Sequence, residues 1–245
     1  MVLPLFSIPE PSILAVGDSY TLDGPEGKHA AQVRRMRVGE GIQLTNGRGL
    51  RAVGKVVSTG STSLVVEFSE VSQEELPALR ITLVQALAKG DRDELAVQAA
   101  TELGALKIIP WQATRSISRW EGDKVEKSRL RWQTIAQEAA KQSLRVWNPE
   151  VLPVASTKQL IQVLESYDSV LILEPTGKLS ITELGSLSGN VALVVGPEGG
   201  IDSSELEKFT EVGFKNVRLG DGVLRTSTAG LAAISYLAGS NGLWG

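Results

Sequence analysis

From Pro77 onward the chain alternates short apolar runs with amphipathic stretches, and this alternation constrains the fold more than any other feature of the sequence. Strands that alternate with helices are joined by crossover connections, which place the strands parallel to one another and cover both faces of the sheet with helices. Residues 191–195 are apolar at every position, which is typical of a strand buried on both faces. The sequence therefore predicts an α/β domain built on a parallel sheet.

The periodicity also predicts the individual elements of this domain. The expected strands are 81–87, 107–111, 169–173, 191–195 and 216–219, and the expected helices are 91–103, 124–143, 202–209 and 226–238. Gly104 stands where a residue of left-handed conformation would end the first helix. The second helix has an apolar face that repeats with helical spacing from Trp132 to Ser143.

The first part of the chain has a different pattern. Short β-branched runs lie at 42–44, 52–57 and 63–68. Asn46-Gly47 and Thr59-Gly60 supply turns between these runs. We expect a small β-barrel or sandwich here, followed by a polar linker that ends at Pro77. The predicted domains are therefore residues 1–74 and 78–245.

Composition excludes several classes of protein. The 245 residues include no cysteine and a single histidine, His29, so disulfides, thiolate metal sites and an all-protein zinc site are not expected. His29 is interpreted as a surface or packing residue rather than a general base. No apolar run reaches the roughly 18 residues that a membrane span requires. Residues 1–11 lack the basic segment that begins a signal peptide, so we expect a cytoplasmic protein.

The net charge of −3 argues against a nucleic-acid partner, but the distribution of the charge argues for one. Residues 28–55 hold seven Lys or Arg and one acidic residue, and residues 107–145 hold nine and four. A phosphate backbone responds to a local basic patch rather than to the total charge of the chain. The alternative, that these side chains lie on scattered solvated faces, stays open.

Three predicted strand ends carry unusual turns, at 171–175, 195–200 and 219–226. Ligands of open α/β sheets bind at the carboxyl ends of the strands, so these turns form the candidate site. Gly196, Gly199 and Gly200 allow the backbone to approach a ligand closely. The dinucleotide and P-loop fingerprints are both missing, which favours a ligand with an adenine but no phosphate. Glycines that only make tight turns are the alternative.

Four basic residues are candidates for contact with such a ligand or with RNA. Arg225 lies between a strand end and the start of a helix, where a cation would stabilise negative charge on a bound base. The alternative for Arg225 is a structural ion pair with Glu198 or Asp221. Together with Arg115, the pair Lys141 and Arg145 would form a phosphate-binding rim, unless these are solvated helix charges.

Taken together, these motifs resemble the RsmE family of ribosomal RNA methyltransferases, which belongs to the SPOUT superfamily. The segments similar to the family's motifs are 29–35, 39–40, 101–104, 115–116, 131–132, 138–145 with Pro149, 195–200, 219–220 and 223–229. They cover nearly the whole chain in the family's order. The chain departs from the common pattern at Ser227, Ala99 and Arg34, where many members have Glu, Lys and Leu.

The resemblance implies a PUA-like β-barrel at the N-terminus, a trefoil-knotted SPOUT domain at the C-terminus and a homodimer with its site close to the subunit interface. It also implies S-adenosyl-L-methionine as the methyl donor, held in a bent shape by the three strand-end loops. The expected donor-binding residues are Leu171, Leu173, Glu174, Val195, Gly196, Pro197, Gly199, Gly200, Leu219, Gly220, Val223, Leu224, Thr226 and Ala229.

The reaction that the resemblance implies is methylation of N3 of a specific uridine in 16S rRNA of the small ribosomal subunit. We expect Arg225 to stabilise the uracil anion on its O2 and O4, and Glu198 to accept the proton or orient the base. The target base must be unstacked to reach the donor. The expected RNA-binding residues are Arg34, Arg35, Arg37, Arg115, Lys141 and Arg145.

Two other functions stay open. One is a SPOUT methyltransferase that acts on a ribose 2′-oxygen or on tRNA. The other is a non-catalytic RNA-binding protein of ribosome assembly.

Overall fold

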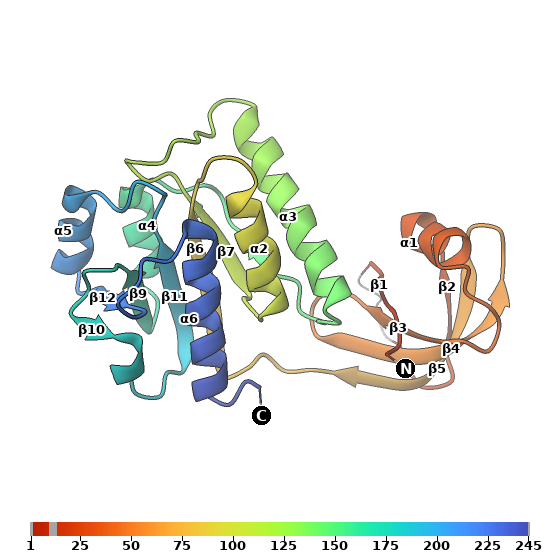
Figure 1. Ribbon diagram of the computed structural model, residues 1–245. Coiled ribbons are helices and arrows are strands. Elements are labelled where there is room, and N and C mark those ends of the chain that lie inside the picture. Colours follow the sequence, from red (N-terminus) through yellow and green to blue (C-terminus); the bar gives the residue numbers. More distant parts are fainter. Residues whose placement is uncertain (1, 10–13, 245) are drawn as a thin grey trace. The chain divides into compact units, whose positions relative to one another are not determined.

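The computed structural model describes residues 2–9 and 14–244, and the chain divides into two compact units (Figure 1). The first unit comprises residues 1–76 and 140–148, and the second comprises residues 77–139 and 149–245. The sequence analysis placed residues 140–148 with the C-terminal domain. The structure groups this segment with the N-terminal one instead.

The first unit is built on a mixed five-stranded sheet in the order β1-β3-β4-β5-β2. Its strands are β1 (Leu5–Ser7), β2 (Ser19–Leu22), β3 (Gly41–Thr45), β4 (Leu50–Thr59) and β5 (Leu64–Gln73). β1 pairs with β3 in parallel and the remaining pairs are antiparallel. The register of β4 against β5 shifts at Val53/Gly54, where a Cβ on Gly54 would lie 2.3 Å from the Glu67 carbonyl oxygen. The bulge therefore requires glycine.

A helical segment interrupts the β-structure that the sequence analysis expected throughout residues 1–74. It consists of α1 (Gly24–Lys28), which has Pro25 in its first turn, and the π-helical turn η1 (His29–Val33). Ala30 is fully buried in the core of this unit, and His29 meets the edge of Phe6 with ring centroids 5.9 Å apart. His29 is thus a packing residue, in line with its interpretation from the sequence.

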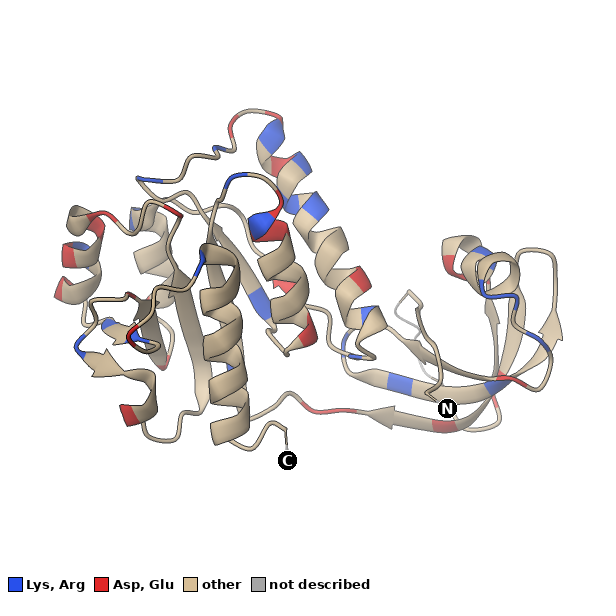
Figure 2. Ribbon diagram, viewed as in Figure 1, with Lys and Arg blue, Asp and Glu red and all other residues tan. Residues whose placement is uncertain are grey.

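The loop after η1 exposes a group of basic side chains around one buried residue. Met36 is buried, whereas Arg34, Arg35 and Arg37 are exposed. Blue segments mark the basic residues of the chain after α1 in Figure 2. Arg35 has φ 53°, which lies in the left-handed region that non-glycine residues rarely adopt. The loop turns sharply enough for the amide N–H of Met36 to donate to the carbonyl of Ala30 at 3.1 Å. Burial of Met36 therefore presents the three neighbouring arginines to solvent.

Residues 140–148 are bound to the first unit by main-chain and side-chain contacts. Backbone hydrogen bonds join Gly49 to the Val146 carbonyl and Asn148 to the Gly47 carbonyl at 2.8 and 2.9 Å. Lys141, whose side chain is 7% exposed, forms an ion pair with Glu26 at 2.8 Å. Because the ammonium group is buried, this ion pair is a structural element of the unit.

The second unit contains a seven-stranded sheet in the order β10-β12-β9-β11-β6-β7-β8, with every pair of neighbours parallel. The strands are β6 (Leu79–Ala86), β7 (Lys107–Trp111), β8 (Glu150–Val151), β9 (Ser169–Leu173), β10 (Leu179–Ser180), β11 (Gly189–Val195) and β12 (Lys215–Arg218). β11 is central and is buried from Val191 to Val195. The predicted parallel sheet and its central strand are confirmed.

Helices cover both faces of this sheet. They are α2 (Arg92–Glu102), α3 (Lys124–Gln142), α4 (Thr157–Leu164), α5 (Ser203–Glu211) and α6 (Thr226–Ser240), with a short 3₁₀ turn, η2 (Ile181–Glu183). α2 and α6 pack on the face formed by Leu83, Leu193 and their neighbours, in front of the strands in Figure 1. α4 and α5 pack on the opposite face, against Val194 and its neighbours. The sequence analysis missed α4, which starts with a capping box at Ser156.

At the β10 edge of the sheet the strands do not follow their order in the chain. β12 lies between β9 and β10, although β9 and β10 are connected to each other earlier in the chain. The connecting segment passes so close to β12 that a Cβ on Gly177 would lie 2.9 Å from the Asn216 carbonyl oxygen. This strand order agrees with the expected trefoil knot, which departs from the ordinary rule that chains do not thread their own loops.

Within the described ranges, no helix combines the length and the apolar character needed to cross a lipid bilayer.

The buried ion pair of the first unit yields a stability prediction. Lys141→Ala leaves the partly buried Glu26 carboxylate without its cation, so we expect the free energy of unfolding to fall by about 2–3 kcal/mol. Adding Glu26→Gln to this variant removes the uncompensated charge and should restore part of the lost free energy of unfolding. Urea denaturation of the single and double variants measures both effects. A double variant no more stable than Lys141→Ala alone would contradict the ion-pair interpretation.

Candidate functional site at the carboxyl ends of β9, β11 and β12

A cavity of about 440 Å³ opens where β9, β11 and β12 end. Its lining residues are Arg92, Leu173, Glu174, Pro175, Val195, Gly196, Pro197, Glu198, Gly200, Ile201, Val217, Leu219, Gly222, Val223, Leu224, Arg225, Thr226 and Ala229. The three turns singled out in the sequence therefore meet around one cavity. Its volume is within the range of cavities that hold a small ligand.

Most of the residues predicted for the methyl donor line this cavity, and three do not. Leu171 is fully buried in the core beneath it, and Gly199 and Gly220 lie outside the lining. The cavity also includes residues that the prediction omitted, among them Arg92 and Ile201. Arg92 carried no local sequence signal, because its place depends on the start of α2 lying beside the loop after β11.

The loop after β11 is shaped by its glycines and by the start of α5. A Cβ on Gly196 would lie 2.7 Å from Cγ1 of Ile201, which is buried beneath the loop. Gly200 has φ 73°, a conformation that favours glycine. Asp202 then caps α5, with its Oδ1 accepting the amide N–H of Ser204 at 3.0 Å. Asp202 and Glu205 together form a capping box at the start of α5.

A hydroxyl-centred chain of hydrogen bonds joins this loop to two other elements. Thr226, the first residue of α6, donates to the Gly196 carbonyl at 2.8 Å and accepts from Nε2 of Gln85 at 2.9 Å. Gln85 lies in β6 and is fully buried. The sequence analysis placed Thr226 in the site but missed Gln85, which reads there as one more strand residue.

Arg225 is exposed at the N-cap of α6 and makes no ion pair with any described residue. The pairing with Glu198 or Asp221 that the sequence left open is therefore not formed. Glu198 instead accepts the backbone N–H of Lys89 at 3.0 Å and pairs with Arg92 at 3.3 Å, both through Oε1. Of the two guanidinium groups that line the cavity, that of Arg225 has no acidic partner among the residues that the structure describes.

The side chain of Arg115 binds the same loop and the residue that caps α5. Its guanidinium donates to the Gly199 carbonyl at 3.3 Å and pairs with Asp202 at 3.1 Å. The other residues predicted to bind RNA, Arg34, Arg35, Arg37, Lys141 and Arg145, lie in the first unit. Burial lowers the pKa of Arg145. The three loop arginines are exposed, whereas Lys141 is engaged with Glu26.

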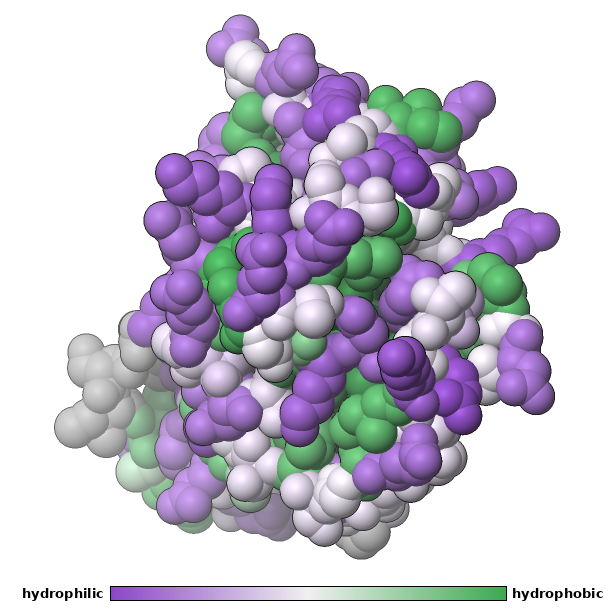
Figure 3. All heavy atoms as spheres, turned by 90° about the vertical axis from the view of Figure 1, so that its left-hand side faces the viewer, coloured by the Kyte–Doolittle hydropathy of each residue, from purple (hydrophilic) through white to green (hydrophobic). Residues whose placement is uncertain are grey.

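In the view of Figure 3 the surface is largely hydrophilic, and apolar side chains form separate patches rather than one broad surface. Among the described residues, no group of His, Cys, Asp and Glu is arranged to hold a metal ion.

The segment that leads into α2 positions the backbone of Lys89 beside the cavity. The conformation of this segment is held by Asp93, which is buried and accepts the amide N–H of Ala88 at 3.1 Å. Burial raises the pKa of Asp93 to about 6, although the N–H groups of Ala88 and Glu94 partly oppose the shift. A carboxyl whose pKa is raised by folding favours the native state at low pH, and this contribution is lost as the pH rises through about 6.

Asp93 therefore yields a pH-dependent prediction. Asp93→Asn keeps an oxygen for the Ala88 N–H and removes the buried charge. We expect the stability of the variant relative to the wild type to rise between pH 5.0 and pH 7.5, by about 1 kcal/mol. Thermal unfolding of both proteins at the two pH values measures the difference. An equal difference at both pH values would show that Asp93 has an ordinary pKa.

Comparisons with known proteins place this architecture in a family. Residues 52–238 match the RNA methyltransferase domain, and residues 22–69 match the RNA methyltransferase PUA domain. The chain is 38% identical to ribosomal RNA small subunit methyltransferase E of Mycobacterium bovis, over 100% of this chain and 94% of the relative. It is 35% identical to the protein of the same name from Bacillus subtilis, with 90% of each chain covered.

Solved structures agree with the sequence relatives. The crystal structure of a ribosomal RNA small subunit methyltransferase E from Neisseria gonorrhoeae, bound to S-adenosyl methionine, superposes with a TM-score of 0.85 at 31% identity, over 97% of this chain and 98% of that one. A putative methyltransferase from Legionella pneumophila with bound SAM gives a TM-score of 0.86 at 28% identity, over 98% of each chain. The chain therefore belongs to the RsmE family of ribosomal RNA small subunit methyltransferases, with a PUA-like domain followed by a SPOUT domain.

Proposed function

We propose that this protein transfers the methyl group of S-adenosyl-L-methionine to N3 of a uridine in 16S rRNA of the small ribosomal subunit. The observation that carries the proposal is the cavity formed by three strand ends of the knotted sheet, with the unpaired Arg225 at its edge. Two relatives of known structure that share the fold hold the same donor. The curated relatives act on RNA of the small subunit, as their name states.

The lining of the cavity fits the donor. Leu173, Val195, Leu219, Leu224 and Ala229 supply apolar surface of the kind that holds a purine and a thioether chain. Gly196 and Gly200 leave main-chain groups uncovered, which suits recognition of the edges of an adenine. When bound, the donor supplies a methyl group on a positively charged sulfur. The carboxylates of Glu174 and Glu198 bring negative charge to the same cavity.

Arg225 is proposed to stabilise the nucleophile. The N3–H group of uracil is a weakly acidic imide, and loss of its proton places negative charge on O2 and O4. The guanidinium of Arg225 has no acidic partner among the described residues, so it is available to interact with that negative charge. Glu198 is proposed to accept the proton or to orient the base. Its Oε1 is occupied by Lys89 and Arg92, and its Oε2 makes no hydrogen bond with a described residue.

We further propose that the PUA-like domain of residues 1–74 binds RNA and that residues 78–245 carry the reaction. The exposed Arg34, Arg35 and Arg37 would contact phosphates, because they stand together on a loop with a fixed backbone. Arg115, Lys141 and Arg145 are proposed to support the RNA-binding surface, Arg115 through the loop that it fixes. The protein is expected to act in the cytoplasm as a homodimer, on rRNA within the small subunit.

One experiment tests the proposed function directly. Small-subunit RNA from a strain that lacks the gene is digested to nucleosides and examined by mass spectrometry, with and without the gene restored. We expect a base-methylated uridine that disappears with the gene and returns with it. A methyl group on the ribose, or on tRNA, would favour the other SPOUT reactions. Unchanged RNA, together with no heat of binding on titration with the donor, would favour a non-catalytic protein.

The loop after β11 yields a prediction on donor affinity. Gly196→Ala places a Cβ 2.7 Å from Ile201, so the loop must shift, and we expect the Kd for S-adenosyl-L-methionine to rise about tenfold. Gly185→Ala is the control, because a Cβ there meets nothing within 4 Å and Gly185 is not part of the cavity. Isothermal titration calorimetry measures both. Equal affinities for the two variants would exclude this loop from donor binding.

The role of Arg225 yields a prediction on the chemical step. Arg225→Ala removes the charge that stabilises the anion, so we expect kcat to fall roughly 10²–10³-fold while the Kd for the donor changes little. Arg225→Lys should retain part of the rate. Lys208→Ala on α5 is the control for loss of an exposed cation. Single-turnover methylation of unmethylated small subunits measures the rate, and full activity of Arg225→Ala would refute the assigned role.

A further inference from the structure

A second cavity, of about 380 Å³, lies in the second unit beside the start of α2. Its lining comes from the segment before α2, from the loop that precedes α3 and from the first turns of α3. The residues are Ala88, Lys89, Gly90, Asp93, Glu94, Ile117, Ser118, Trp120, Lys124, Ser128, Arg131 and Trp132. None of these residues lines the donor cavity.

The unsatisfied charge in this second cavity is positive. Lys89 and Lys124 are exposed, and their ammonium groups have no acidic partner among the described residues. The acidic groups are already engaged, because Glu94 is paired with Arg131 and Asp93 accepts the N–H groups of Ala88 and Glu94. The cavity is therefore suited to an anion.

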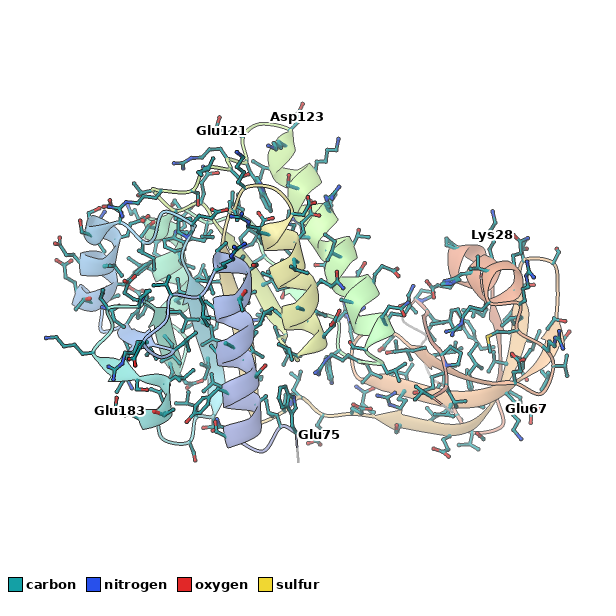
Figure 4. The ribbon with its side chains drawn as sticks, in the orientation of Figure 1. Lys28, Glu67, Glu75, Glu121, Asp123 and Glu183 are labelled. Carbon is teal, nitrogen blue, oxygen red and sulfur yellow. The ribbon has the colours of Figure 1, made fainter. Side chains whose placement is uncertain are left out.

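Apolar and hydroxyl groups complete the lining. Ile117 is 66% exposed at the cavity, and Trp120 and Trp132 form its floor with ring centroids 5.0 Å apart. Ser118 and Ser128 add hydroxyl groups. Cations, apolar surface and hydroxyl groups are the kinds of group that contact the phosphate, the base and the ribose of a nucleotide. Figure 4 places the acidic residues Glu121 and Asp123 on the nearby loop before α3, and neither lines the cavity.

Both walls of the second cavity are bonded to the loop that lines the donor cavity. The backbone N–H of Lys89 donates to Glu198, and Arg115, two residues before Ile117, donates to the Gly199 carbonyl. A polymer whose reactive base entered the donor cavity would therefore have a neighbouring unit within reach of the second one.

We propose that the second cavity is a subsite for a nucleotide that neighbours the target uridine in the RNA strand. Lys89 and Lys124 bind its phosphate, and Ile117 contacts its base. The inference rests on the proposed function, since it deepens the contact with the RNA substrate.

Two lysines on α3 provide a test variant and its matched control. Lys124 lines the cavity, whereas Lys127, three residues further along the same helix, is exposed and does not line it. With unmethylated small subunits as the probe, we expect Lys124→Ala to weaken binding 5–10-fold, which corresponds to about 1–1.4 kcal/mol. The slope of log affinity against log salt should become shallower by about one. Lys127→Ala should match the wild type in both measurements.

Ile117→Ala gives an independent check, because it removes apolar contact without removing charge. We expect weaker binding of the subunits with an unchanged salt slope. Equal affinities and slopes for Lys124→Ala and Lys127→Ala would overturn the subsite. The two proposals fail separately: the subsite is judged by binding of the RNA, whereas the proposed function is judged by methylation and donor binding of the wild-type protein.

Discussion

The arrangement of the site depends on one hydroxyl group, that of Thr226. It donates to the Gly196 carbonyl and accepts from Gln85, so it ties together the end of β6, the loop after β11 and the first residue of α6. The partner Gln85 is fully buried, and a hydrogen bond in such surroundings is both strong and costly to leave unmade. Arg225 directly precedes Thr226, so the same bonds that hold the donor loop also fix the backbone from which the guanidinium extends.

The knot explains why turns so far apart in the chain meet at one cavity. β12 is inserted between β9 and β10, so the end of β12 lies at the same edge as the ends of β9 and β11. The segment that crosses β12 approaches it so closely that Gly177 has no room for a side chain. The segment after β9 is therefore held against β12, which lies later in the chain. Loops fixed in this way can line a cavity whose shape exists before the ligand arrives.

The sequence predicted those parts of the structure that depend on local pattern. β9 and β11 were found because strands buried on both faces leave continuous apolar runs, and the loop after β11 was singled out because its glycines directly follow such a run. The roles of Gln85 and Arg92 were not found, because each depends on a neighbour more than a hundred residues away. The same is true of the ion pair between Lys141 and Glu26, which also joins residues more than a hundred positions apart.

The charges at the donor cavity are distributed unevenly, and this difference bears on catalysis. Arg92 is neutralised by Glu198 and Arg115 by Asp202, so neither projects a full charge, whereas Arg225 has no such partner among the described residues. A neutral uracil gains little from a nearby guanidinium, but the anion formed at N3 gains the interaction of a full charge. In the proposed reaction this arrangement would stabilise the transition state more than the bound substrate, and differential stabilisation of this kind is what accelerates a reaction. The ion pair of Arg92 with Glu198 contributes to the same effect, because a further free cation at the cavity would repel the positively charged donor.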